Sequence, residues 1–208
     1  MKNKRYVVFG IGSNLGDRIG YVMHGVDMLL QRLNRDAGDE RLSHLYETLP
    51  IGGPVQGDYI NAALSLATSM SAHDLLHCAQ QVEKHYGRVR VERFGPRTLD
   101  IDMLWIEDEP VSTPDLEVPH PRLLERAFAL TPLLDVQPHA VHPRTHRPIS
   151  DALTRQMQAQ QRLRRLTASE LDTWLTEHAR QHGTSALRHR ISARLARETN
   201  PFARAGTP

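Results

Sequence analysis

The sequence lacks the features that would place it in a membrane or in a disulfide-stabilised fold. Its single cysteine, Cys78, excludes an internal disulfide framework and a cysteine-based zinc cluster. No apolar run reaches the roughly 20 residues that a membrane-spanning helix needs. The apolar stretch at 6–11 is also too short for a signal peptide. These absences predict a cytoplasmic protein without a membrane partner.

Lysine is absent from the last part of the chain. Residues 151–208 hold ten arginines and five acidic residues, a net charge of +5, whereas residues 1–150 carry −3. The basic surplus belongs to the C-terminal segment, so the overall charge of +2 is no argument for nucleic-acid binding. With 39% hydrophobic and 24% charged residues over 208 positions, the chain has the composition of a folded globular protein.

The spacing of apolar residues predicts an alternation of strands and helices through residue 106. Short apolar or alternating runs indicate strands at 6–11, 41–48, 58–68 and 98–106. Apolar positions at helical spacing indicate helices at 19–33 and 72–86, for which Asp17 and Ser71 are N-cap candidates. The order βαββαβ predicts an α+β protein of the ferredoxin-like class, with an antiparallel sheet and two helices on one face.

The composition changes after residue 106. Eight of the 13 prolines fall in 107–150, which predicts loops with one helix near 121–130. Helical patterns follow from about 150 to 165, at 168–180 and at 185–198. We therefore expect a first domain at 1–150 and an arginine-rich helical extension at 151–208. The extension either packs on the sheet or on another subunit, as in a homo-oligomer, or binds an anionic partner through Arg162, Arg164 and Arg165.

Paired acids at the end of Arg97–Asp102 are the sharpest chemical feature. On a strand, residues i and i+2 project from the same face, so Asp100 and Asp102 would lie side by side while Leu99 and Ile101 face the core. Neighbouring carboxylates repel each other unless cations intervene, and a pair of Mg²⁺ ions that share phosphate oxygens meets that need. Arginines just before the pair add groups that bind phosphate, which favours a triphosphate site over two solvated acids. These arginines are Arg88, Arg90, Arg93 and Arg97.

Other patterns are weaker. The glycines of Gly10–Gly16 do not fit a dinucleotide-binding fingerprint, because the third is misplaced, so we interpret the segment as a tight turn from strand to helix. The twelve histidines are scattered without metal-ligand spacing. His120, held between two prolines, is the candidate for a functional histidine, and Cys78 fits a core position.

Four blocks together resemble the 6-hydroxymethyl-7,8-dihydropterin pyrophosphokinase family of the folate pathway. They are Gly12–Asp17, Tyr46–Thr48 with Asp58–Ala63, Gly87–Arg88 with Arg93–Asp102, and Pro119–Arg122 with Arg126–Leu133. The third block is the most specific, and the blocks span about residues 5–138. The resemblance implies the ferredoxin-like fold and a reaction in which ATP gives its β,γ-pyrophosphoryl group to the hydroxymethyl oxygen of the pterin, while AMP leaves.

By matching position, the resemblance implies a two-metal triphosphate site. Asp100 and Asp102 would hold two Mg²⁺ ions, and Asp102 is the candidate to accept the hydroxyl proton. The loop between Gly87 and Gly95 would close over the phosphates of ATP. Two of the implied nucleotide contacts, Gln80 and Glu83, lie on the exposed edge of the second helix. The others are Arg88, Arg90, Phe94, Arg97, His120 and Arg126. The resemblance also implies a catalytic role for Arg88 and Arg97.

The same resemblance implies a pterin pocket. The implied contacts are Thr48, Leu49, Ile51, Tyr59, Asn61 and Phe128. Tyr59 and Phe128 match the stacking residues, and Asn61 matches the amide that recognises the pyrimidine-like edge, because one amide offers both donor and acceptor. Leu49 stands where the family usually has proline, and Phe94 stands where tryptophan is common.

Other activities stay open. A ferredoxin-like two-metal nucleotidyl transferase also uses paired strand acids, but it releases pyrophosphate rather than AMP. A paralogue would act on a different pterin, and Leu49 is the one hint of this. An RNA-binding module of the same fold would need exposed aromatic residues on its strands, and the sequence has none in that pattern, so we expect no nucleic-acid partner.

Overall fold

The computed structural model describes residues 3–33, 38–87 and 95–182, and the chain divides into two compact units, residues 1–165 and 166–208. The strands are β1 (Arg5–Ser13), β2 (Gly38–Leu42), β3 (Tyr46–Thr48), β4 (Tyr59–Thr68), β5 (Asp100–Ile106), β6 (Val111–Ser112), β7 (Glu117–Val118) and β8 (Arg164–Arg165). The helices are α1 (Arg18–Leu33), α2 (Ala72–His85), α3 (Ala127–Val136), α4 (Arg155–Gln160) and α5 (Ala168–His182), with 3₁₀ turns at Leu123–Glu125 and Ile149–Ala152.

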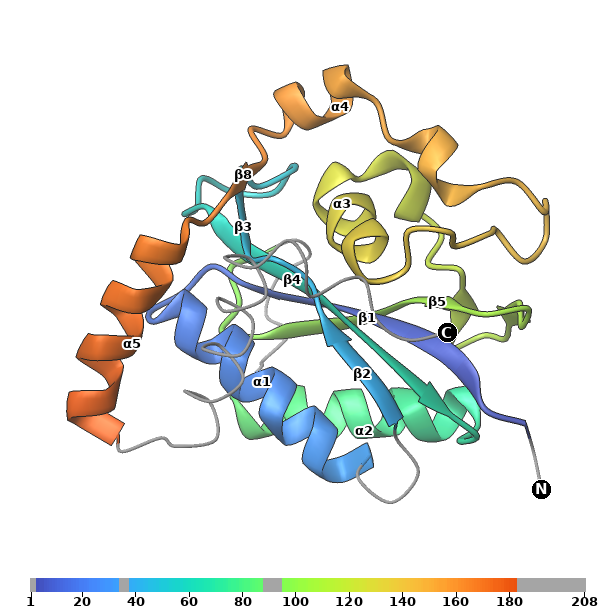
Figure 1. Cartoon of the computed structure of the whole chain (residues 1–208), viewed down its shortest axis with the longest axis horizontal. Coiled ribbons are helices and arrows are strands. Elements are labelled where there is room, and N and C mark those ends of the chain that lie inside the picture. The colour runs from blue at the N-terminus through green and yellow to red at the C-terminus, as the bar shows by residue number, and fades with distance from the viewer. Residues whose placement is uncertain (1–2, 34–37, 88–94, 183–208) are drawn as a thin grey trace, which may run out of the picture. The chain divides into compact units, whose positions relative to one another are not determined.

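An antiparallel sheet forms the centre of the first unit, in the order β5-β1-β4-β3-β8, and β2 also pairs with β4 (Figure 1). Strand β1 lies between β5 and β4, so that Gly12 is opposite both Asp100 and Asn61. The predicted mixed α+β class with an antiparallel sheet is therefore confirmed. The predicted helix caps are confirmed as well: Gly20 N donates to Asp17 Oδ1 at 3.0 Å, and Asp74 N donates to Ser71 Oγ at 3.2 Å.

The sequence predicted two helices on one face of this sheet, and in the structure a third helix covers the other face. Helices α1 and α2 lie on one side and α3 on the other (Figure 1). The α3 side is closed by a buried cluster that includes Val8 and Leu104 of the sheet and Leu130 and Leu133 of α3. Burial on both faces explains why β4 is almost wholly buried instead of alternating between core and solvent.

The predicted strand at 41–48 is interrupted in the structure. Asp135 Oδ2 of α3 accepts hydrogen bonds from His44 N at 3.0 Å, His44 Nδ1 at 2.7 Å and Tyr46 Oη at 2.8 Å, so the His44 main chain is bound to α3. Partial burial acts to raise the pKa of Asp135, but the hydrogen bonds from His44 and Tyr46 outweigh it and lower the pKa. This connection fixes β3, which carries Thr48.

Two predicted helices have different bounds. The helix expected near 121–130 begins at Ala127, because Arg126 before it is extended (φ −122°, ψ 103°), and it continues through Pro132 to Val136. The helical pattern expected to run to 165 forms only the short α4 and then β8, which pairs with β3. The first compact unit ends at Arg165, after this pairing. The division of function at residue 150 stays a prediction.

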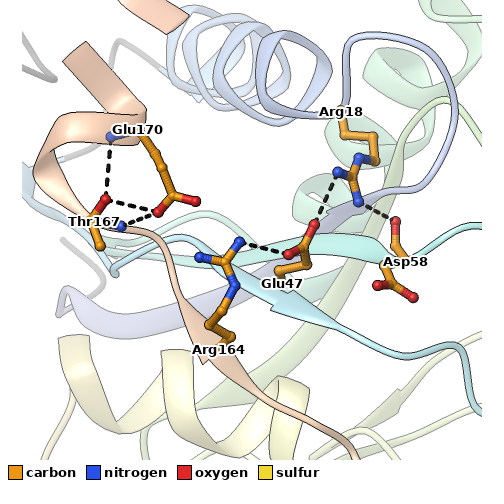
Figure 2. A network of polar contacts seen from close by, with 6 residues as sticks. All are labelled: Arg18, Glu47, Asp58, Arg164, Thr167 and Glu170. Atoms are coloured by element: carbon orange, nitrogen blue, oxygen red, sulfur yellow. Dashed lines mark hydrogen bonds and ion pairs between the residues drawn. The ribbon is translucent and has the colours of Figure 1, made fainter. Parts of the chain in front are cut away.

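The second unit is described as far as His182. Helix α5 begins with a capping box, in which Thr167 N and Oγ1 donate to Glu170 Oε2 at 2.7 and 2.8 Å and Glu170 N donates to Thr167 Oγ1 at 3.2 Å (Figure 2). The helix predicted at 185–198 lies outside the described residues. Among the described helices, none is both long and apolar enough to cross a membrane.

Candidate active site

Two glycines of β1 lie opposite residues of the site on the neighbouring strands. Gly10 and Gly12 lie opposite Asp102 and Asp100 of β5, respectively, and Gly12 is also opposite Asn61 of β4. A Cβ atom at Gly12 would lie 2.7 Å from Asn61 Oδ1, closer than atoms can pack. The sequence interpretation of this segment as a turn was wrong at Gly12, which lies within a strand. Its missing side chain leaves room for the Asn61 amide.

A cavity of about 240 Å³ lies beside these strands. Its lining comes from β3, β4 and the loop between them, from β5 and the residues before it, and from the segment that leads into α3. The residues are Thr48, Leu49, Pro50, Ile51, Gln56, Tyr59, Asn61, Arg97, Asp100, Asp102, His120, Arg126 and Phe128. All six predicted pterin contacts are among these residues, together with five of the predicted ATP or metal residues. One polar and partly aromatic cavity therefore joins the two halves of the predicted site.

Aromatic and amide groups lie at one part of the lining. Asn61 is buried and its Nδ2 donates to Thr48 Oγ1 at 2.8 Å, which holds the amide against β3. Tyr59 Oη donates to Gln56 Oε1 at 3.4 Å. The guanidinium carbon of Arg126 lies 5.5 Å from the centre of the Phe128 ring, close enough for a cation–π contact. Such groups suit a flat ring with polar edges.

Acids and arginines occupy the rest of the cavity. Asp100 and Asp102 share one face of β5, while Leu99 and Ile101 are buried on the other, as predicted. Arg97 Nη1 lies 2.6 Å from Asp100 Oδ2. Burial acts to lower the pKa of Arg97, but the nearby carboxylates of Asp100 and Asp102 outweigh it, so the pKa is raised and the guanidinium stays charged.

His120 and Arg126 bring further donors to the cavity. His120 Nδ1 accepts from Arg122 N at 3.1 Å, so the neutral ring carries its proton on Nε2. Burial, and then the positive charge of Arg126, lower the pKa of His120. Burial also lowers the pKa of Arg126, whose Nε is buried and has no hydrogen-bond acceptor among the described residues. A donor of this kind is suited to an anionic ligand.

The predicted nucleotide residues of α2 do not reach the cavity. Gln80 and Glu83 are absent from its lining in the described structure. The prediction that Glu83 lies on an exposed edge was wrong. Its side chain is only 5% exposed, and its Oε1 accepts a hydrogen bond from Ile101 N at 2.7 Å. This acid therefore fixes β5 between the two aspartates. Arg88, Arg90 and Phe94, with most of the predicted closing loop, lie outside the described residues.

Three residues of the site were missed by the sequence analysis. Pro50 and Gln56 line the cavity. Asn14 holds Arg97 in place: its Oδ1 accepts from Arg97 N at 2.8 Å, and its own N donates to Arg97 O at 3.2 Å. Asn14 Nδ2 also donates to Gln56 Oε1 at 2.9 Å. The signal in the sequence was a polar residue directly after an apolar strand, but its partner lies far along the chain.

A chain of charges fixes β3 from outside the cavity. Glu47 lies between two arginines, with Arg18 Nη2 at 3.0 Å from Oε1 and Arg164 Nη2 at 2.6 Å from Oε2 (Figure 2). Arg18 Nη1 also donates to the carbonyl of Asp58, the residue before β4, at 2.7 Å. The hydrogen bond from Arg164 is the largest cause of the lowered pKa of Glu47. The network connects β3, β4 and β8.

Replacing Gly12 with alanine should disturb the amide end of the cavity. The new Cβ, 2.7 Å from Asn61 Oδ1, would displace the amide and break its hydrogen bond to Thr48. We expect the KM for a ligand held by Asn61 to rise about tenfold or more. Gly57→Ala is the matched control, because its Cβ would lie 3.7 Å from Asn14 O, an ordinary contact. Equal KM values in the two variants would contradict this role of Gly12.

The lowered pKa of His120 predicts a dependence of stability on pH. The folded state binds a proton at this ring less readily than the unfolded state, so stability is full above the ordinary pKa of 6.5 and falls as the pH drops from there toward the lowered pKa. Melting temperatures between pH 7.5 and 5 should therefore fall less steeply in His120→Gln than in the wild type. Identical slopes in His120→Gln and the wild type would contradict the prediction.

Fold and cavity together define an α+β protein with a small-molecule site built of paired acids, arginines and aromatic rings. A family model, 7,8-dihydro-6-hydroxymethylpterin-pyrophosphokinase (HPPK), matches residues 8–138. The chain is 38% identical to the 2-amino-4-hydroxy-6-hydroxymethyldihydropteridine pyrophosphokinase of Aquifex aeolicus over 145 residues, 70% of this chain and 88% of that protein. It is 40% identical to the enzyme of the same name from Bacillus subtilis over 136 residues, 65% of this chain and 79% of that protein.

Solved structures show the same fold. An HPPK-DHPS crystal structure in complex with substrates aligns with a TM-score of 0.56 at 11% identity, over 88% of this chain and 45% of that chain. An HPPK-DHPS of Plasmodium falciparum aligns with a TM-score of 0.53 at 14% identity, over 73% and 44%. The chain thus spans less than half the length of these HPPK-DHPS chains. From the family match and the sequence relatives, the chain belongs to the HPPK family, which confirms the resemblance.

Proposed function

We propose that this protein transfers the pyrophosphoryl group of ATP to the hydroxymethyl group of 6-hydroxymethyl-7,8-dihydropterin in folate biosynthesis. The pterin hydroxyl oxygen forms a bond to the β-phosphorus of ATP, and the bond from that phosphorus to the α,β-bridging oxygen breaks. AMP leaves with the bridging oxygen, and the hydroxyl proton passes to Asp102. The protein is thus an ATP-dependent pyrophosphokinase, with ATP as its co-substrate.

One observation carries this proposal: a single cavity brings the acids and cations suited to a triphosphate next to the rings and amide suited to a pterin. Tyr59 and Phe128 are the proposed stacking residues, and Asn61 the residue that recognises the ring edge. The proposed pterin site is completed by Thr48, Leu49 and Ile51. Holding both substrates in one cavity supplies much of the catalysis, because it converts a bimolecular reaction into a local one.

The positively charged and hydrogen-bond-donating side chains of the cavity support the proposed nucleotide site. Arg97, Arg126 and the Nε2–H of His120 are the proposed donors to the phosphates of ATP. Gln80, Arg88, Arg90 and Phe94 remain proposed nucleotide contacts, and Arg88 a catalytic residue. For Glu83, the hydrogen bond to Ile101 N supports a positioning role instead.

Asp100 and Asp102 fit a magnesium site. Two carboxylates on one strand face supply the oxygen ligands that Mg²⁺ prefers, and Mg²⁺ is commonly bound by one or two carboxylates with substrate phosphates and water. No cluster of three or more His, Cys, Asp or Glu side chains suited to a metal occurs among the described residues, which agrees with a site that substrate completes. When bound, two Mg²⁺ ions would neutralise the charge that develops on the phosphate oxygens.

Three finer assignments are also proposals. The strand order with β1 central, flanked by β5 and β4 and followed by β3, supports a ferredoxin-like core with α3 and β8 added to it. The single cysteine supports a cytoplasmic location. Self-association through residues 151–208 is the proposal for the extension. Light scattering of the full chain against a chain ending at Arg165 tests the part of the extension that follows β8.

The decisive test is incubation of the protein with ATP, Mg²⁺ and 6-hydroxymethyl-7,8-dihydropterin. Stoichiometric AMP and pterin pyrophosphate are expected. Release of pyrophosphate instead would favour the nucleotidyl transferase. Release of AMP with a differently substituted pterin, and none with this one, would favour the paralogue. The absence of any pterin-dependent ATP consumption would overturn the proposed function.

A further inference from the structure

We propose that Gln161 is a positioning residue of the pterin pocket, although it lies beyond residue 138, where the family match ends. It joins the segment that carries Leu49 to the segment that carries Phe128, and both of these residues line the cavity. Gln161 itself is not part of the lining, so it acts through its neighbours. This inference rests on the proposed function of the cavity.

The contacts of Gln161 use its main chain and both ends of its carboxamide. Its carbonyl oxygen accepts from Leu49 N at 3.2 Å. Its Oε1 accepts from Phe128 N at 3.2 Å, and its Nε2 donates to the carbonyl of Glu125 at 3.3 Å. One residue thus connects the chain just after β3 with the turn that leads into α3.

Burial makes these contacts costly to lose. Gln161 is 8% exposed and follows directly after α4, a helix that Thr154 caps by accepting from Met157 N at 3.1 Å. A buried amide whose partner is removed leaves a donor or acceptor unsatisfied. The main chain at Phe128 and Glu125 would then have to move toward water or toward another partner, and the Phe128 ring would move with it.

A second connection fixes the other end of the same segment. Arg164 pairs with Glu47 in the register of β3 and β8, and their side chains form the ion pair at 2.6 Å (Figure 2). Thr48, which binds Asn61, lies between Glu47 and Leu49. Residues 161–164 therefore fix both sides of Thr48. A stacked ring needs its partners held to within about 0.5 Å, which a loop without such support does not provide.

Gln161→Leu tests the proposal, because leucine keeps much of the volume but removes both amide hydrogen bonds. The matched control is Gln158→Leu. Gln158 also joins α4 to α3, because its Nε2 donates to Thr131 Oγ1 at 3.4 Å. Neither Gln158 nor Thr131 lines the cavity. We expect the KM for the pterin to rise about tenfold in Gln161→Leu and to stay unchanged in Gln158→Leu. The fluorescence of the pterin, titrated with the apoprotein and an unreactive ATP analogue, should show the same loss of affinity.

The outcomes separate this proposal from the proposed function. If the wild type releases no AMP with the pterin, the function itself is wrong. If the wild type is active and Gln161→Leu binds the pterin as well as Gln158→Leu does, the positioning role is overturned. If Gln161→Leu does not fold, Gln161→Glu replaces it, because its carboxylate still accepts from Phe128 N while it loses the donor to Glu125. For Gln161→Glu we then expect a pterin KM above that of the wild type but less than tenfold higher. A pterin KM equal to that of Gln158→Glu overturns the proposal.

Discussion

Replacing Asp102 with asparagine should reduce the rate of pyrophosphoryl transfer by about 10³-fold or more. The side chain keeps its shape, so the fold should survive, but the cavity loses one of the two negative charges that would hold magnesium at the triphosphate. Asp100→Asn should have a similar effect on turnover. The Asp100 variant also loses the negative charge that lies 2.6 Å from Arg97 Nη1, so its stability should fall more than that of Asp102→Asn. Turnover and urea unfolding, measured on both variants, check these expectations.

Asp108→Asn is the control for these two variants. Asp108 lies just after β5, is exposed, and has a φ of 51° that asparagine tolerates well. It removes the same charge from the same stretch of chain, outside the cavity. Binding of Mn²⁺ in the presence of an unreactive ATP analogue gives a readout other than turnover: it should weaken in the variants of Asp100 and Asp102 and not in the control. Full activity and unchanged Mn²⁺ binding in either aspartate variant would remove the two-carboxylate site.

The elements that local pattern determines were predictable. The strands β1, β4 and β5 and the helices α1 and α2 follow from apolar spacing and from the caps at Asp17 and Ser71. The break between β2 and β3 was not, because it depends on Asp135, which lies 91 residues from His44. Likewise, α3 on the second face of the sheet was not predictable from period-two strands, since a strand covered on both faces carries apolar residues on both.

The site shows the same division. The resemblance indicated six pterin contacts and both acids, and the structure brings them to one cavity, while their roles stay predictions. It did not indicate Asn14 or Gln161, because their partners lie 83 residues away at Arg97 and 33 residues away at Phe128. The sequence analysis also placed Glu83 wrongly on an exposed edge. Nothing in the helix sequence shows that this carboxylate accepts a hydrogen bond from the main-chain N–H of Ile101. Local pattern finds the groups that do chemistry more readily than the groups that hold them.

Arg97→Ala should lower kcat by about 10²–10³-fold while it changes pterin binding much less. The guanidinium lies in the cavity beside Asp100, and its main chain is held on both sides by Asn14, so it is placed to meet a phosphate group without reorganisation. An arginine that stabilises charge developing in the transition state contributes to kcat more than to ground-state binding. Steady-state kinetics with each substrate varied in turn, and direct titration of the pterin, measure the two quantities separately.

Two further variants decide how Arg97 acts. Arg97→Lys keeps the charge but loses the planar fork, so it should recover only part of the lost rate if two donors meet the phosphates together. Arg122→Ala is the control, because Arg122 pairs with Glu125 at 3.3 Å and does not line the cavity. A loss of pterin affinity as large as the loss in kcat would show that Arg97 supports the pocket and not the transition state. Full recovery by lysine would show that its charge, and not its geometry, is what the reaction uses.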